Sequence, residues 1–373
     1  MPICMTATVA ANRATSVVRH YAASNVWSAP GVAATIWPLG DADASAAQPL
    51  GQGYALVGSD ENQVLRIYAR FFSGPPLAGT DVTPFLGLTG VPDDDEVDIK
   101  ATADPRNANR IYWSGSHGSS KKGNRKPNRE HIFTTDLSGV GVATTLAVNG
   151  CHEHLRDHLV AWDHTNLHGL GVDYLGLTAS ACTDASGSHG IVPKSIDGFN
   201  IEGMSFSSDG STTWLGFRAP LLPPSSPAAN AEATNSRVPT LLVPTSNFAA
   251  LASGAAGHAS GQALHGAPIL LDLGGLGVCE IKCNSYGCLI AAGPFDGTDD
   301  MGALFPWSGN ATDAPVRRTA NLLGLNVEGI VELPNRALSE SDALERVSDD
   351  GWRNFYAPTL PPDGDDGAAK ALP

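Results

Sequence analysis

Charged residues are scarce in this chain of 373 residues, at 16%, and cations are fewer than anions, with 23 Lys and Arg against 38 Asp and Glu. The formal net charge of −15 argues against nucleic-acid binding, because phosphate contacts need clustered Lys and Arg. The one basic run, residues 121–129, lies between two expected strands. We interpret it either as a solvated hairpin loop or as a contact for an anionic ligand.

Long hydrophobic runs are also missing. No stretch of 18 apolar residues occurs, so the sequence predicts no membrane span. The first 13 residues lack a basic start followed by an apolar core, which argues against a signal peptide. We therefore expect a cytoplasmic protein, or a periplasmic or secreted one if a leader has been removed.

The six cysteines match no common zinc pattern. Cys279, Cys283 and Cys288 lie in or near one strand-turn-strand, where we expect buried thiols or one local disulfide. The run Cys151-His-Glu-His154 resembles a metal motif, and its two histidines would share one face of a strand. His158 and further histidines lie nearby, but the sequence identifies no third ligand.

Turn formers are plentiful, with 41 Gly and 26 Pro, and no helical periodicity persists for more than a few turns. The clearest local unit runs from Asn200 to Arg218, where two apolar runs flank Asp209-Gly210. An Asp-Gly between two such runs is a strong hairpin signal. This composition favours many short strands over long helices.

About six such β units follow one another along the chain. They begin near residues 32, 95, 140, 200, 268 and 325. Successive β units of 40–50 residues predict an all-β fold, a β-propeller of about six blades with a range of five to seven. A pair of β-sandwich domains is the alternative. We expect residues 1–31 to form an N-terminal segment that can supply a closing strand, residues 32–360 the propeller, and residues 361–373 a disordered acidic tail.

One short pattern recurs at the expected inner strands: a polar residue, an apolar residue and a charge. It occurs as Asp98-Ile99-Lys100, Asn200-Ile201-Glu202, Glu280-Ile281-Lys282 and Asn326-Val327-Glu328. If these strands surround one axis, their charges alternate in sign around it. We interpret the ring either as a structural salt-bridge network or as a ligand or cation site at the mouth of a channel. The second interpretation uses Glu202, Glu328, Asn200 and Asn326.

Several stretches resemble a bacterial family that carries only a domain-of-unknown-function label. They are residues 59–68, 111–129, 199–203, 216–221, 292–294 and 303–307. That family is predicted to be a β-propeller and is distantly similar to the esterase-like phytase domain. The resemblance therefore implies a hydrolase with Ca²⁺ as cofactor. Where the family pattern is similar to Asp-Ile-Glu-Gly, this chain has Asp98-Ile99-Lys100-Ala101. That cation weakens a metal site and suits an anionic ligand better.

Candidate site residues follow from these patterns. We expect His117, Glu202, Glu328 and Arg218 to be catalytic, with His117 as general base and Arg218 as a clamp for a carboxylate or phosphate. The expected ligand-binding residues are Asp60, Glu61, Asp98, Lys100, Asn200 and Asn326. No nucleophile elbow, Walker loop or dinucleotide fingerprint occurs. Two functions remain: a hydrolase of small esters, phosphoesters or lactones, and a propeller that binds a small molecule or a protein without catalysis.

Overall fold

The computed structural model describes most of the chain between residues 43 and 348. The described ranges are 7–9, 43–72, 74–88, 96–104, 109–181, 191–222, 239–253, 261–298, 302–319, 322, 327–339 and 344–348. The expected acidic tail and most of the expected N-terminal segment lie outside these residues.

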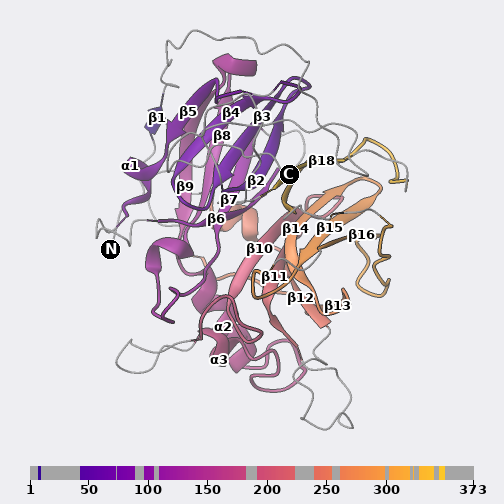
Figure 1. Cartoon of the computed structure of the whole chain (residues 1–373). Coiled ribbons are helices and arrows are strands. Elements are labelled where there is room, and N and C mark those ends of the chain that lie inside the picture. Colours follow the sequence, from indigo (N-terminus) through magenta and orange to yellow (C-terminus); the bar gives the residue numbers. More distant parts are fainter. Residues whose placement is uncertain are drawn as a thin grey trace.

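The fold is mostly β and is a β-propeller, as the sequence predicts (Figure 1). Four sheets with three or more strands are present in the described residues, together with a two-stranded one. The first is β2 (Ala44–Leu50), β3 (Tyr54–Ser59), β4 (Val64–Ala69) and β5 (Ala78–Asp81). The second is β6 (Ile99–Ala103), β7 (Arg110–Gly115), β8 (Ile132–Ser138) and β9 (Thr145–His152), with β1 (Ala7–Val9) at its edge.

The remaining sheets continue the same order along the chain. The third is β10 (Asn200–Phe206), β11 (Thr213–Leu221), β12 (Pro239–Thr245) and β13 (Ile269–Asp272). The fourth is β14 (Gly277–Asn284), β15 (Gly287–Gly293) and β16 (Ala303–Trp307). The last is β17 (Val327–Glu332) with β18 (Glu345–Ser348).

The first strand of each sheet is its innermost strand, and these five strands form a closed ring. Strand β2 contacts β6, β6 contacts β10, β10 contacts β14, β14 contacts β17, and β17 returns to β2. Every pairing within a sheet is antiparallel. The chain therefore closes around one axis rather than dividing into two sandwiches.

Hydrophobic clusters fill the spaces between neighbouring sheets. Trp113 packs with Leu56 between the first and second sheets, and Leu304 with Ile330 between the fourth and the last. A cluster that joins Val331 of β17 to Ala47 of β2 closes the ring. Because each sheet is buried on both faces by its neighbours, burial of apolar surface holds the ring together.

The described residues form five sheets, at the lower end of the expected range of five to seven blades, for a reason visible in residues 140–181. Those residues supply the strand β9, which pairs with β8 in the second sheet, and then the helices α2 (Leu155–His164) and α3 (Leu177–Ala181). In α2, Leu155, Leu159 and Trp162 are buried, at the spacing of one helical face. The short helices α1 (Thr83–Leu86) and α4 (Phe248–Leu251) complete the helices named here.

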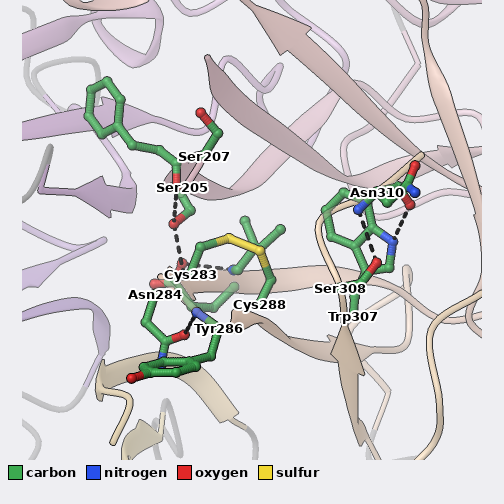
Figure 2. The surroundings of a disulfide bond; sticks show 12 residues. Ser205, Ser207, Cys283, Asn284, Tyr286, Cys288, Trp307, Ser308 and Asn310 are labelled. Atoms are coloured by element: carbon green, nitrogen blue, oxygen red, sulfur yellow. Dashed lines mark hydrogen bonds between the residues drawn. A yellow bond between two sulfur atoms is a disulfide. The ribbon is translucent and has the colours of Figure 1, made fainter. Parts of the chain in front are cut away.

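A disulfide between Cys283 and Cys288 closes the β14–β15 hairpin. A local disulfide was one of the two expectations for these cysteines. Cys283 and Cys288 stand opposite each other in the register and form the bond. Figure 2 shows the Cys283 backbone N–H donating to Ser205 Oγ of β10, at 3.0 Å. The hairpin is thereby tied to the third sheet, while Cys279 remains a buried free thiol.

Gly203 of β10 lies closely against strand β14. A Cβ at this position would stand 2.6 Å from Val278 Cγ1 and 3.3 Å from the Ile281 backbone nitrogen. The glycine that follows Glu202 is therefore required by packing between the two strands.

We expect Gly203→Ala to lower the free energy of unfolding by about 1–3 kcal/mol, because the added methyl group overpacks the space between two sheets. The matched control is Gly53→Ala in the β2–β3 turn, where a Cβ meets nothing within 4 Å. That variant should stay within about 0.5 kcal/mol of the parent in urea unfolding. Equal stability of the two variants would contradict the packing described.

Candidate functional site

The inner strands share one irregularity. Each has a break in register beside its first residues, which leaves one residue without a direct partner on the neighbouring strand, as in a β-bulge. The bulged residues are Ser45, Lys100, Glu202, Cys279 and Glu328. A bulge redirects a side chain, and here the same device occurs at the corresponding place in all five inner strands.

Four of the bulged side chains, all but Ser45, form a compact group together with one arginine from a second strand. We call Lys100, Glu202, Arg218, Cys279 and Glu328 the axial cluster. Ligand atoms of Glu202, Cys279 and Glu328 all lie within 4.8 Å of one another. Four of these five side chains, all but Cys279, are among the site residues expected from the sequence, and Lys100, Glu202 and Glu328 each lie on an inner strand.

In the fourth sheet the expected match between Lys282 and Glu202 of the third sheet is wrong. The residue that corresponds to Glu202 is Cys279, three positions before Lys282. Lys282 instead donates from Nζ to the carbonyl oxygen of Ala47 in β2, at 3.0 Å. The expected alternation of Lys and Glu around the axis is therefore broken by a neutral thiol.

Arg218 of β11 links the carboxylates of two different sheets. Its Nη1 donates to Glu202 Oε2 at 2.9 Å and to Glu328 Oε1 at 3.3 Å. Its Nε donates to the carbonyl oxygen of Pro294, at 2.8 Å. Arg218, Glu202 and Glu328 are each at most 4% exposed, so these charges interact in a poorly hydrated interior.

Lys100 and Asp60 form a second ion pair, which is more exposed than the first. The Lys100 ammonium contacts Asp60 Oδ2, and the two side chains are 11% and 15% exposed. The carboxylates of Glu202 and Glu328 act on the same ammonium. Lys100 and Asp60 are therefore more accessible to solvent than Arg218 and Glu202.

Burial and charge shift the acid–base properties of the cluster. Burial raises the pKa of Glu202 above its ordinary value, although the Arg218 guanidinium opposes that shift. Burial alone would lower the pKa of Lys100, but the carboxylates of Asp60 and Glu328 raise it well above the ordinary value. Burial also raises the pKa of the Cys279 thiol. Cys279 is thus kept as a neutral thiol, while Glu202 can exchange a proton nearer to neutral pH.

Two expected ligand-binding residues carry buried oxygens with no hydrogen-bond partner in the described part of the chain: Asn200 Oδ1 and Asp60 Oδ1. The other side of the Asn200 amide is engaged, since Nδ2 donates to Glu202 Oε1 at 2.7 Å. A buried acceptor without a partner costs about 1–3 kcal/mol, so a water or a ligand hydroxyl is favoured at both atoms.

The other expected ligand-binding residues differ in placement. Asp98 is buried, accepts from Ser116 Oγ and lies 3.3 Å from the Arg129 guanidinium. Glu61 is exposed, and its backbone N–H donates to Ser59 Oγ within the turn. Asn326 lies outside the described residues.

His117 is not in the axial cluster. It is fully buried, its Nε2 lies 3.1 Å from Ser114 Oγ, and its carbonyl oxygen accepts from Arg156 Nη1 at 2.8 Å. Burial, with a further contribution from Arg156, lowers the pKa of His117 to about 3. It is therefore a neutral ring in a hydrogen-bonded turn, and it is a poor general base near neutral pH.

The basic loop is divided between ion pairs and solvent. Arg125 donates to both Glu130 and Asp157, and Arg129 donates to Glu96. Lys121 and Lys122 are exposed, as a solvated hairpin loop predicts. Both arginines are thus engaged in ion pairs with other parts of the chain.

We tested whether the axial cluster fits the Ca²⁺ that the family resemblance implies. Ca²⁺ takes six to eight oxygen ligands, whereas this group offers a thiol, and Arg218 already donates to both carboxylates. The residues present do not fit Ca²⁺ at Glu202 and Glu328. Positive charge beside the carboxylates comes from Arg218 and Lys100.

We expect Arg218→Met to lower the free energy of unfolding by about 3–5 kcal/mol near pH 8, because it leaves two buried carboxylates without a counter-charge. A carboxyl whose folded pKa is raised favours folding below its unfolded pKa and loses that contribution as pH rises through the folded value. The loss in Arg218→Met should therefore be smaller at pH 5 than at pH 8.

The control is Arg110→Met, which removes a half-buried pair with Asp136. That change should cost about 1 kcal/mol or less, since partly exposed ion pairs contribute little. Urea unfolding at both pH values gives the comparison. A loss in Arg218→Met no larger than in Arg110→Met, or one independent of pH, would contradict the buried pairing.

Comparisons with known proteins give one family model that matches part of the chain and carries no assigned reaction. The model of a family described as "Protein of unknown function (DUF3616)" matches residues 187–347, which contain most of the axial cluster. No curated protein matches the chain. Among solved structures, one titled "Crystal structure of the Saccharomyces cerevisiae Sqt1" is 8% identical, with coverage of 85% of this chain and 96% of that one. Its TM-score of 0.30 is too low to carry an argument. No helix in the described residues is long and apolar enough to cross a membrane.

Proposed function

We propose that this propeller hydrolyses a small ester, phosphoester or lactone at the axial cluster. The observation that carries the proposal is Glu202, a buried carboxyl whose pKa burial raises and which is hydrogen-bonded to both Arg218 and Asn200. Functional sites are where burial and neighbouring charges shift the pKa of a carboxyl in this way.

The chain offers each part that such a reaction needs. Asn200 Oδ1 is an available acceptor on the same amide that binds Glu202, so it supports a water beside that carboxylate. Glu202 accepts a proton from this water as it attacks the carbonyl carbon or phosphorus, and returns the proton to the leaving oxygen. The negative charge that develops on the substrate is stabilised by Lys100, which is on the more exposed side of the cluster.

A ligand-binding propeller without catalysis is the second candidate, and one observation favours it. Arg218 already bonds both Glu202 and Glu328, which suits a structural ion-pair network as well as a reaction centre. Under this alternative a small molecule binds beside Lys100 and Asp60 and leaves unchanged.

Glu202→Gln distinguishes the two functions. We expect the parent to hydrolyse nitrophenyl esters, nitrophenyl phosphoesters or small lactones, and the variant to lose about 10²- to 10⁴-fold in kcat/KM, as expected for a lost general base. Because the pKa of Glu202 is raised, activity should begin to fall on acidification above pH 4.5, the ordinary value for Glu. Steady-state rates across pH provide the measurement.

The matched control is Glu332→Gln, a carboxylate on inner strand β17 that is 50% exposed and paired with Arg70. Its activity should equal that of the parent. An inactive parent whose thermal midpoint still rises with an added ester or phosphate would favour the binding function. Equal activity in the parent and in Glu202→Gln would end the proposed hydrolytic role.

A further inference from the structure

Three histidines converge where β9 ends and α2 begins, apart from the axial cluster. His152 is the last residue of β9, His154 is the N-cap of α2, and His158 lies one turn further along the helix. Their ring centroids are 5.4 Å apart for His152 and His158, 5.9 Å for His152 and His154, and 6.3 Å for His154 and His158. The third ligand that the sequence did not identify is therefore His158.

These separations are close to those of a three-histidine metal site. With metal–nitrogen distances of about 2.0–2.1 Å, three imidazoles on one tetrahedral ion have ring centroids about 5 Å apart. The observed centroid separations exceed that value by roughly 0.4–1.3 Å, and the donor nitrogens of the three rings do not all lie within 4.8 Å of one another. Binding therefore requires the three side chains to rotate toward a common point. His154 and His158 also have the four-residue spacing that brings side chains together on a helix.

The three imidazole rings range from buried to exposed, so the site is open to solvent on one side. His152 is buried, His158 is half-buried and His154 is exposed. A cation can therefore approach from the side of His154, while water can fill a remaining coordination position.

Among the described residues beside the three rings, Glu153 and Cys151 are already engaged, which leaves a set of imidazole nitrogens. Glu153 lies against His131, with Oε1 3.5 Å from His131 Nε2, and Cys151 is disulfide-bonded and offers no thiolate. Imidazole sets without thiolate or carboxylate suit Zn²⁺, Ni²⁺ and Cu²⁺ rather than Ca²⁺ or Mg²⁺.

Coordination has one cost that the structure makes explicit. His158 Nδ1 accepts a hydrogen bond from the Ala263 backbone N–H, at 3.2 Å, so the proton of the neutral ring is on Nε2. If Nδ1 binds the metal, it can no longer accept this hydrogen bond. If Nε2 binds the metal, the ring proton moves to Nδ1, and the hydrogen bond is lost as well. A bond of this kind is worth about 1 kcal/mol, whereas micromolar binding supplies about 8 kcal/mol.

We propose that His152, His154 and His158 bind one divalent transition-metal ion, of which Zn²⁺ is the probe of choice. The ion would fasten the end of β9 to the first turn of α2. No residue of this site belongs to the axial cluster, so the inference does not depend on the hydrolytic function.

The test is isothermal titration of the full-length protein with ZnCl₂ in a non-chelating buffer. We expect one Zn²⁺ per chain in the parent, and affinity lower by more than about tenfold in His154→Ala and in His158→Ala. The control is His164→Ala, on the same helix, whose ring is exposed and contacts Asp173. That variant should bind as the parent does.

Thermal unfolding provides a second readout on the same proteins. Zn²⁺ should raise the thermal midpoint of the parent and of His164→Ala, and should leave that of His154→Ala unchanged. Because His154 is exposed, its replacement is not expected to prevent folding. Absence of Zn²⁺ binding in the parent, or binding that His154→Ala and His158→Ala leave intact, would overturn the proposal.

Discussion

The contact of Arg218 with two carboxylates is the interaction on which the centre of this propeller depends. Glu202 comes from the third sheet and Glu328 from the last, so one guanidinium joins parts of the ring that are distant in sequence. Removing these charges from water costs several kcal/mol for each ion, and only mutual pairing offsets that cost. The sheets must therefore close accurately enough to bring the three groups within hydrogen-bonding distance.

That accuracy is supplied by a bulge repeated in every inner strand. Regular strands alternate their side chains between the two faces, which here are buried against the neighbouring sheets. A bulge at one residue redirects that side chain, as with Lys100, while the apolar residues around it, such as Ile99, continue to pack between sheets. The bulge thus allows each inner strand to contribute apolar side chains to the packing between sheets and one side chain to the axis.

Much of this could be predicted from the sequence, because hairpin turns and alternating apolar residues are local signals. The Asp209-Gly210 turn and the recurrence at Lys100, Glu202 and Glu328 indicate the fold class, and the expected site residues include every member of the axial cluster except Cys279. Cys279 was missed because a pattern search for charge favours Lys282 in the same strand, and only the register identifies the bulged residue. Helix α2 was missed because its single apolar face is only three turns long. The burial of His117 depends on distant residues such as Arg156, which no local pattern reports.

The central claim is that Arg218 and Glu328, from different sheets, meet at the axis with Nη1 3.3 Å from Oε1. A double-mutant cycle of unfolding free energies, with Arg218→Met, Glu328→Gln and the double variant, measures this contact directly. The structure predicts a coupling energy of about 0.5–3 kcal/mol. Additive effects, with coupling indistinguishable from zero, would mean that the two side chains do not meet and that the ring is not closed as described.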